Sequence, residues 1–350
     1  MKKITFVRRQ DIKSGGAENY LRRLINELKK REIELEIVDL DQPKWLPSWL
    51  KLPLYNYQAC KAKKNRCYFS NDRLSCLDIH RAGGGTHKSF LKVKGFSLNP
   101  LHLVYLWLEK KTFDKTKKII AVSRMVKRDI IRDYKVAPEN IEVIYNGINI
   151  PEDDKESINL IKKELCKEFD INIKQKIILY VGSGFKRKGV AEFLEILSKI
   201  DKDFIAFVVG KEKKLKKYKE LAKSLGLEER VIFTGVREDA DKFYKSSDIF
   251  LFPTHYEPFG NVILEAMSFF NVVITTKQCG AGEIIEDSPI METPKDYKIV
   301  EFIQEVLDDS KKMESIKIKN RKTAEKYSIQ KNVDKTIELI KKVQNENTIN

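Results

Sequence analysis

The sequence predicts an α/β protein made of two doubly wound domains that face each other across a cleft. Two observations carry this prediction. The chain has 350 residues, more than one ordinary domain, and its hydrophobic fraction of 42% is sufficient for two packed cores. In addition, short apolar runs typical of buried strands alternate with helical patterns, and this alternation begins anew in the second half.

The first domain is expected over residues 1–150. Its first strand is followed by a polar loop with Gly15 and Gly16, and then by a helix whose apolar residues recur at helical spacing between Tyr20 and Leu28. Residues 43–76 contain three prolines and are expected to be irregular. The remaining expected elements are strands at Ile4–Val7, Leu35–Leu40, Ile119–Val122 and Ile141–Ile144, a core helix at Leu101–Leu108 and a helix at Met125–Asp133.

The second domain is expected over residues 151–330, after a linker that begins at Pro151. Residues 331–350 are predicted to form a charged helix that packs back across the domain junction. The expected strands are Ile177–Val181, Ile205–Val209, Val231–Thr234, Ile249–Phe252 and Val272–Thr275, with helices at Val190–Ile200 and Leu215–Leu225.

The excess positive charge belongs to the first domain. Residues 1–150 hold 31 Lys and Arg against 16 Asp and Glu, whereas the rest hold 36 against 35, in a chain of net charge +16. This asymmetry indicates an anionic partner for the first domain: nucleic acid, a phosphorylated glycan or an acidic membrane surface.

Cysteine usage and hydropathy favour a cytoplasmic protein. None of the five cysteines forms a C-x-x-C pair, so the sequence gives neither a disulfide framework nor a zinc spacing, and a reducing compartment is expected. The opening residues predict a strand rather than a signal peptide. No stretch approaches the roughly 20 apolar residues of a membrane span.

The segment His255–Glu265 carries the most specific chemistry. Two carboxylates, Glu257 and Glu265, bracket Gly260 and Asn261, and an apolar helix pattern follows. Glu257 is placed in the loop before this helix and Glu265 in its second turn. Because a helix start presents backbone N–H groups and a positive dipole end, it binds phosphate. Flanking carboxylates suit hydroxyl groups, and together these features indicate a nucleotide-sugar site.

The segment 181–190 is expected to bind a diphosphate. It follows a strand and opens a helix, but its glycines do not have the G-x-G-x-x-G spacing, and the P-loop Lys-Ser/Thr pair is absent. Three cations, Lys186, Arg187 and Lys188, stand in the loop instead, where they would hold a diphosphate and stabilise it as it leaves. A solvated basic turn is the alternative.

Three further features of the first domain admit two interpretations each. Gly15 and Gly16 allow close backbone approach to a ligand, or form a plain turn. His87, after Gly83–Gly85, is a base or an acceptor-binding group, or a polar turn residue. The basic run Lys61–Arg66, near two tryptophans, either contacts a membrane interface or belongs to a loop folded on its own aromatics.

No metal site is predicted. The two Asp-x-Asp pairs, Asp39/Asp41 and Asp239/Asp241, stand where ordinary helices and strands begin or end, and no His or Glu cluster accompanies them.

The segment Glu257–Glu265 resembles the signature of retaining glycosyltransferases with the GT-B fold, group 1 family, in which two Glu are separated by seven residues. Other segments fit as well, and the resemblance runs from Gly15 to about Asp287. Within the family the chain looks most like the α-1,3-glucosyltransferases of the lipopolysaccharide core. The other matching segments are Phe252-Pro253, the 181–190 loop, Tyr145–Ile148, Val208–Gly210, and Thr275-Thr276 before Cys279-Gly280.

The resemblance implies two Rossmann-like domains, the first for the acceptor and the second for a UDP-sugar, and no cofactor or metal. Arg187 and Lys188 would bind the donor diphosphate, and Glu265 would bind the ribose hydroxyls. Glu257 would hold the transferred sugar and phosphate with the backbone of the residues that follow. These residues are Phe259, Gly260, Asn261 and Val262, with Gly15, Gly16 and His87 expected on the substrates from the first domain.

One departure separates the chain from the core glucosyltransferases. Gly84 stands where they have an Asp near the reacting sugar. The resemblance therefore supports the donor sugar and the acceptor less strongly than it supports the reaction class. The expected activity is metal-independent transfer of a hexose, glucose first, to a lipid-linked phosphorylated glycan at the inner face of the cytoplasmic membrane. One alternative is an enzyme of the same fold that uses another nucleotide sugar for capsule or glycoprotein glycans. The other is a nucleic-acid-binding protein, which is disfavoured because the most specific motif, Glu257–Glu265, lies in the second half of the chain, where the net charge is close to zero.

Overall fold

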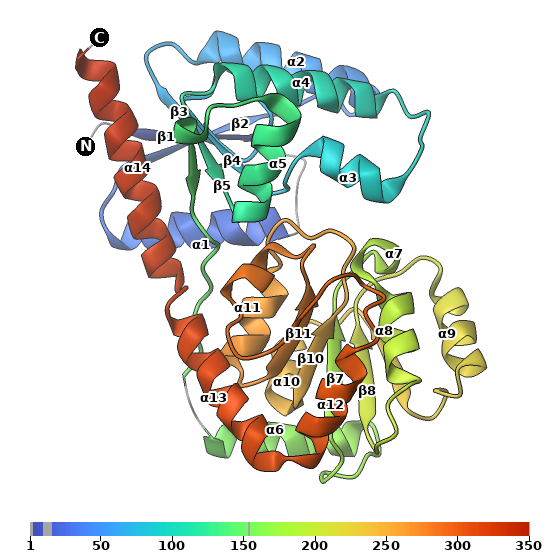
Figure 1. The fold of residues 1–350 in the computed structure, drawn as a ribbon. Helices are drawn as coiled ribbons and strands as arrows, with labels where there is room; N and C mark the ends of the chain where they lie inside the picture. Colours follow the sequence, from blue (N-terminus) through green and yellow to red (C-terminus); the bar gives the residue numbers. More distant parts are fainter. Residues whose placement is uncertain (1–2, 10–15, 153–154, 350) are drawn as a thin grey trace. The chain divides into compact units, whose positions relative to one another are not determined.

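The computed structural model describes residues 3–9, 16–152 and 155–349. The chain divides into two compact units, one formed by residues 1–147 with 329–350 and the other by residues 148–328 (Figure 1). The chain therefore passes between the units twice, at Gly147–Ile148 and at Ser328–Ile329. The last helix belongs to the first unit.

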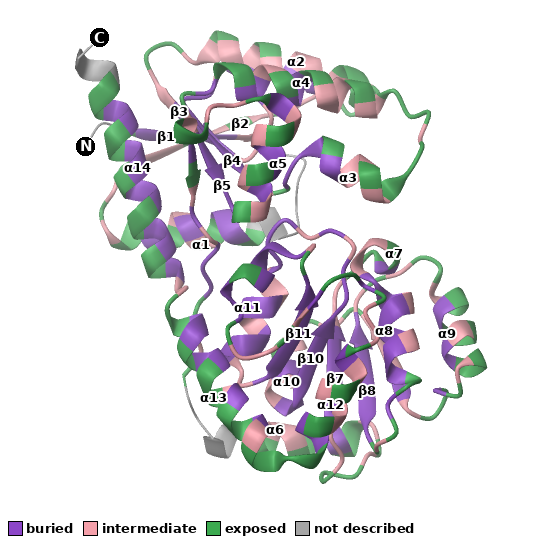
Figure 2. Cartoon of the chain, viewed as in Figure 1, coloured by how far each residue is buried: buried purple, intermediate pink, exposed green. Residues whose placement is uncertain are grey.

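The first unit is a six-stranded sheet in the order β2-β1-β3-β4-β5-β6, in which every pairing is parallel. Parallel sheets of this kind are covered on both faces, and most residues of the interior strands are buried, as Figure 2 shows in purple. The strands are β1 (Ile4–Arg9), β2 (Leu35–Leu40), β3 (Cys67–Ser70), β4 (Ile79–Ala82), β5 (Lys118–Ala121) and β6 (Ile141–Val143). The helices are α1 (Gly16–Lys30), α2 (Ser48–Ala62), α3 (His87–Lys94), α4 (Leu101–Lys115), α5 (Arg124–Tyr134), the 3₁₀ turn Pro138–Asn140 and α14 (Ile329–Ile349).

Helices cover both faces of this sheet. Phe6 of β1 packs in a cluster with α1 and α14, whereas its neighbour Val7 packs on the opposite face with Tyr55 and Ala59 of α2. The apolar residues of α14, from Ile329 to Val343, are buried in the first of these clusters. The C-terminal helix thus completes the core of the first unit.

The second unit has the sheet order β12-β11-β10-β7-β8-β9, again entirely parallel. Its strands are β7 (Ile177–Val181), β8 (Ile205–Val209), β9 (Val231–Gly235), β10 (Ile249–Phe252), β11 (Val272–Thr276) and β12 (Ile290–Met291). Its helices are α6 (Lys155–Glu168), α7 (Phe185–Lys188), α8 (Val190–Leu197), α9 (Leu215–Ser224), α10 (Ala240–Ser246), α11 (Asn261–Ser268), the 3₁₀ turn Gly280–Ile284, α12 (Ile299–Asp308) and α13 (Ser310–Glu325). The order reverses between β7 and β10, and ligands of such sheets bind at the carboxyl ends of the strands beside that reversal.

The expectation of irregular structure over residues 43–76 is wrong. The segment contains α2 and β3, and α2 continues through Pro53, which lies inside the helix. The expectation of no disulfide is also corrected, because Cys60 of α2 is bonded to Cys76, with the two Cα atoms 5.5 Å apart. The fold brings the end of α2 against the turn after β3, a pairing that the spacing of the cysteines does not indicate.

Candidate functional site

Two glycines and one backbone contact fix the loop between β7 and α8. Gly184 and Gly189 have φ of +79° and +78°, values that favour glycine. A Cβ on Gly189 would lie 1.8 Å from the carbonyl oxygen of Pro253, so no other residue fits there. The carbonyl of Arg187 accepts a hydrogen bond of 3.0 Å from the backbone N–H of His255. The cations of this loop are therefore held against the segment that follows β10.

Arg187 and Lys188 of α7 converge on the carboxylate of Glu257. Nη1 of Arg187 lies 3.2 Å and Nζ of Lys188 lies 3.4 Å from the same oxygen, Oε2. Arg187 also donates to the carbonyl of Tyr256. The three side chains are 32%, 17% and 16% exposed, so a ligand can reach them. Two cations on one carboxylate leave a positive charge that attracts an anion.

The loop that carries Glu257 is tied to the segment after β11 by backbone hydrogen bonds. The Glu257 N–H donates to the carbonyl of Gln278, and the Glu257 carbonyl accepts from Gly280, each over 2.9 Å. The carbonyl of Phe259 accepts from the N–H of Ala281 over 2.8 Å. These bonds hold the loop rigid up to the start of α11.

The thiol of Cys279 supports the same loop. It is buried and donates to the carbonyl of Phe259 over 3.1 Å. Burial and the nearby Glu257 carboxylate raise the pKa of Cys279 to about 12. The group therefore stays a neutral thiol and acts by packing, not as a nucleophile.

The start of α11 lies directly after this loop. Gly260 precedes the helix with φ of +94°, and a Cβ there would lie 3.0 Å from the Cys279 sulfur. Asn261 and Val262 are half-buried at the first two helical positions. The backbone N–H groups of a first turn, together with the helix dipole, favour a bound anion at this place.

Glu265 lies one turn further along α11 and is oriented by Tyr244. The Tyr244 hydroxyl donates to Oε2 of Glu265 at 3.5 Å. Burial, followed by the Glu265 carboxylate, raises the pKa of Tyr244 well above its usual value, so the phenol remains a donor. The sequence does not single out Tyr244, because an aromatic residue on an apolar helix face is normally a core residue.

His255 and Glu192 form a second supporting pair, which their separation of 63 residues hides in the sequence. His255 Nε2 lies 3.0 Å from Oε1 of Glu192, which belongs to α8. Burial raises the pKa of Glu192, but the hydrogen bond and the charge of His255 outweigh it and the pKa is lowered. The pair connects α8 to the segment that leads to Glu257.

In the second unit, three of the predicted donor-site residues form one group. Arg187, Lys188 and Glu257 are in direct contact, and the chain from Glu257 leads through Gly260 to α11 and Glu265. Lys186, the third cation of the loop, is exposed on α7, and no contact of it with Glu257 is found among the described residues. Its role in the diphosphate site remains a prediction.

His87 lies in the first unit, as the first residue of α3. Its backbone N–H is 2.9 and 2.8 Å from the two oxygens of Glu109. Its Nε2 is 2.9 Å from Nδ1 of His102, whose Nε2 in turn meets the ammonium of Lys94. Since Lys94 can only donate, His102 accepts from it and donates its Nδ1 proton to His87.

The ring of His87 is neutral near pH 7. Burial lowers the pKa of His87 to about 4, and the positive charge of Arg73 adds to the effect. The ring lies against Tyr105, with the ring centres 4.9 Å apart. A neutral imidazole held in this way is a hydrogen-bonding group with a fixed orientation.

Glu109 is the anchor of this region, although its place in the sequence does not indicate such a role. Its side chain is 1% exposed and accepts from Nε of Arg73 over 2.7 Å and from the hydroxyl of Tyr134. A buried carboxylate is stable only when charge and hydrogen bonds compensate it. The pattern of an apolar helix that ends in charged residues did not distinguish Glu109 from a solvated residue.

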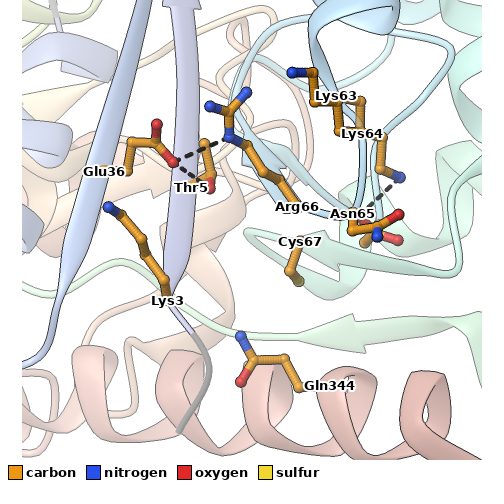
Figure 3. A pocket seen from close by; sticks show the side chains of 10 residues that line it. Lys3, Thr5, Glu36, Lys63, Lys64, Asn65, Arg66, Cys67 and Gln344 are labelled. Atoms are coloured by element: carbon orange, nitrogen blue, oxygen red, sulfur yellow. Dashed lines mark hydrogen bonds and ion pairs between the residues drawn. The ribbon is translucent and has the colours of Figure 1, made fainter.

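A polar pocket of about 730 Å³ lies at the amino ends of the strands of the first unit (Figure 3). Several of its cations are paired, as with Lys63 and Asp78 at 2.8 Å and Arg66 and Glu36 at 3.2 Å. The pocket lies at the edge of the sheet opposite to the loop that leads to His87. We assign it no part in the site.

Gly15 lies outside the described residues, and Gly16 is the first residue of α1. Their predicted contact with the donor remains a prediction. Across residues 3–9, 16–152 and 155–349, the structure gathers no group of three or more His, Cys, Asp or Glu side chains suited to a metal ion.

Family comparisons match most of the second unit and part of the first. Residues 161–323 match the family described as Glycosyl transferases group 1, and residues 78–151 match Glycosyltransferase Family 4. The lipopolysaccharide glucosyltransferase WaaG of Escherichia coli K12 is 28% identical over 226 residues, 62% of this chain and 60% of WaaG.

A second curated relative is the N-acetylgalactosamine-N,N'-diacetylbacillosaminyl-diphospho-undecaprenol 4-alpha-N-acetylgalactosaminyltransferase of Campylobacter jejuni. It is 25% identical over 229 residues, 64% of this chain and 60% of that protein. These matches span about three fifths of the length of each relative.

Solved structures agree over nearly the whole chain. A crystal structure of WaaG has a TM-score of 0.80 at 21% identity and covers 96% of this chain and 99% of that chain. Anabaena HepE in complex with UDP and glucose has a TM-score of 0.72 at 19% identity, over 97% and 99%. These likenesses establish the arrangement of two six-stranded parallel sheets as a known fold.

Proposed function

Because the chain carries a group 1 glycosyltransferase domain in a GT-B fold and is related to glycosyltransferases of lipopolysaccharide and capsule synthesis, we propose that it transfers a hexose from a UDP-sugar to a lipid-linked glycan. The transferred sugar is proposed to be glucose, by likeness to WaaG. The observation that carries the proposal is the contact of Arg187 and Lys188 with Glu257 beside the start of α11.

The diphosphate of the donor would replace Glu257 as the partner of the two cations. Arg187 forms a fork that suits phosphate oxygens, and Lys188 adds a point charge. The N–H groups at Asn261 and Val262 would bind the same anion from the helix start. Glu257 is then released toward the hydroxyls of the transferred sugar. Because the two cations and the helix start would balance the negative charge of the diphosphate, they support the proposal that no metal ion is required.

We assign retention of configuration to attack from the face that the diphosphate leaves. The bond between the anomeric carbon and the phosphate oxygen breaks, and the acceptor oxygen bonds to the same face of that carbon. The acceptor proton passes to the departing phosphate oxygen, and Arg187 and Lys188 stabilise the negative charge that develops there. Glu257, released from the two cations by the diphosphate, serves as a hydrogen-bond acceptor for the hydroxyls of the sugar in this proposal.

The first unit supports a role at an anionic membrane surface. Trp45 is 82% exposed just before α2, and Trp49 and Trp107, on the neighbouring helices α2 and α4, are 43% and 45% exposed. Tryptophan beside lysine is typical of the headgroup region. No helix within the described part of the chain combines the length and apolar character that a membrane crossing requires. We therefore propose peripheral contact with the inner face of the cytoplasmic membrane.

The Glu265→Gln variant tests the donor site. If the Glu265 carboxylate accepts hydrogen bonds from the ribose hydroxyls, the loss of its charge weakens binding of UDP by about tenfold or more, as expected for bonds to a charged group. Calorimetric titration with UDP measures this. The matched control is Glu220→Gln on α9, whose side chain is 65% exposed. Equal UDP affinity in both variants would remove the ribose-binding role.

A further inference from the structure

An apolar groove separates α3 from the start of α4 in the first unit. It has a volume of about 750 Å³, within the range of about 300–1,000 Å³ typical of small-molecule sites. Aliphatic and aromatic side chains line most of it: Leu91, Phe96, Leu98, Leu103 and Leu106. Such a lining suits a hydrocarbon chain.

The connecting loop exposes apolar side chains to an unusual degree. Phe96 is 92% and Leu98 is 86% exposed in this loop, and Leu103, in the first turn of α4, is 70% exposed. Single exposed apolar residues are common, but a contiguous group around a groove is typical of a binding site. The polar groups of this loop bond to each other, since Oδ1 of Asn99 accepts from the N–H of Leu101 over 3.0 Å. They do not make the groove polar.

Cations lie along one rim of the groove. Lys88 and Lys92 are among its lining residues, and Lys94 contacts His102, which also lines it. The carboxylate facing these lysines is Asp133, which is 3.7 Å from Lys92 and is already paired with Arg132 at 2.8 Å. Lys88 donates to the backbone carbonyl oxygen of Asp133 and lies 4.6 Å from the ring centre of Tyr134, and neither contact neutralises its charge. The rim therefore retains positive charge that complements a phosphate.

The same rim leads to His87. Nδ1 of His102 is 2.9 Å from Nε2 of His87. A ligand with its chain in the groove would place a phosphate at Lys88 and Lys92, and the group linked to that phosphate next to His87. The order of chain, phosphate and sugar matches that of a lipid-linked glycan.

We propose that this groove between α3 and α4 binds the hydrocarbon chain of a single lipid phosphate acceptor, with the phosphate held by Lys88 and Lys92. The inference rests on the proposed function, and it names the acceptor class and the residues that select it. It differs from docking on a bilayer surface, because one lipid molecule is recognised by both its chain and its phosphate.

The test compares farnesyl phosphate, isopentenyl phosphate and inorganic phosphate in calorimetric titrations of the full chain, below the critical micelle concentration. Since each buried methylene strengthens binding by about fourfold, farnesyl phosphate should bind at least about tenfold more tightly than isopentenyl phosphate. Phe96→Ala with Leu98→Ser should abolish this preference. Both side chains are exposed, so the double variant should fold, which its unchanged thermal melting would verify.

Three controls make the outcome decisive. Lys88→Ala with Lys92→Ala should weaken binding of both lipid phosphates by a similar factor and leave the chain-length preference intact. Leu160→Ser, at a residue 59% exposed on α6, and Trp49→Ala should leave the preference unchanged. Titration with UDP in every variant separates the two proposals, because retained UDP binding with no chain-length preference overturns the groove alone.

The last part of the experiment measures binding of the protein to phosphatidylglycerol vesicles. If the double variant loses vesicle binding while the wild-type protein shows no chain-length preference for soluble lipid phosphates, the loop contacts a bilayer and the groove proposal is wrong. If the wild-type protein binds no UDP, the proposed function itself fails.

Discussion

Replacement of Arg187 by Ala is expected to lower kcat by about 10²–10³-fold, with a smaller change in KM. The reason is that Arg187 stabilises charge that develops on the leaving diphosphate, and removal of one preorganised donor of this kind has effects of that size. Initial rates of donor turnover, measured over a range of UDP-sugar concentrations, separate the two constants.

Lys186→Ala is the matched comparison for this prediction. Lys186 precedes Arg187 on α7 and carries a similar charge, but it is exposed, whereas Arg187 lies 3.2 Å from Glu257. We expect its kcat to stay within about threefold of the wild-type value, a change of less than 1 kcal/mol. If Arg187→Ala instead raises KM and leaves kcat unchanged, Arg187 contributes only to ground-state binding.

Replacement of Gly189 by Ala is expected to destabilise the second unit strongly and to abolish UDP binding. The added Cβ would lie 1.8 Å from the carbonyl oxygen of Pro253, at a φ of +78°. Backbone strain and overpacking each cost about 1–3 kcal/mol, so the sum is about 3 kcal/mol or more. The melting temperature of a unit of this size should fall by about 6–12 °C, as measured by differential scanning calorimetry.

Gly226→Ala separates backbone strain from steric contact. Gly226 has a φ of +70°, but a Cβ there would meet no atom within 4 Å. Its loss of stability should therefore be about 1 kcal/mol, with UDP affinity retained. Equal melting temperatures for the two variants would contradict the contact between the 181–190 loop and Pro253.

The strands of the second unit could be predicted from the sequence with little error. Ile177–Val181, Ile205–Val209 and Ile249–Phe252 have the expected bounds, because a strand buried on both faces must be a continuous apolar run between polar turns. In contrast, α2 was missed. Its apolar residues are spread around the helix and it contains Pro53, so neither helical periodicity nor proline statistics indicated a helix.

Site residues that are close together in the sequence were also predictable, whereas those brought in from distant positions were not. Glu257, Gly260 and Glu265 lie within nine consecutive residues, so their spacing reports their geometry directly. Tyr244 and Glu109 act through contacts with residues 21 to 36 positions away. Their residue types are those of ordinary core or surface positions, so only the folded chain shows that they orient Glu265 and the backbone of His87.

The His87 region shows how the fold changes the meaning of a motif. The sequence offered His87 as a catalytic base or as a polar turn residue. The structure places it between Glu109 and His102 with a pKa lowered to about 4, so the ring is neutral near pH 7 and carries a single N–H proton. This supports a hydrogen-bonding role toward a substrate, which stays a prediction.

The most direct test of the central claim is calorimetric titration of the wild-type chain with UDP-glucose, UDP-galactose, UDP-N-acetylglucosamine and GDP-mannose in the presence of a chelator. We predict that one UDP-sugar, UDP-glucose first, binds at least about tenfold more tightly than GDP-mannose, without a metal ion. Binding of UDP-sugars only after a divalent cation is added would contradict the proposed offset of the diphosphate charge by Arg187 and Lys188. Absence of binding by all four would contradict the assignment of the second unit as the donor site.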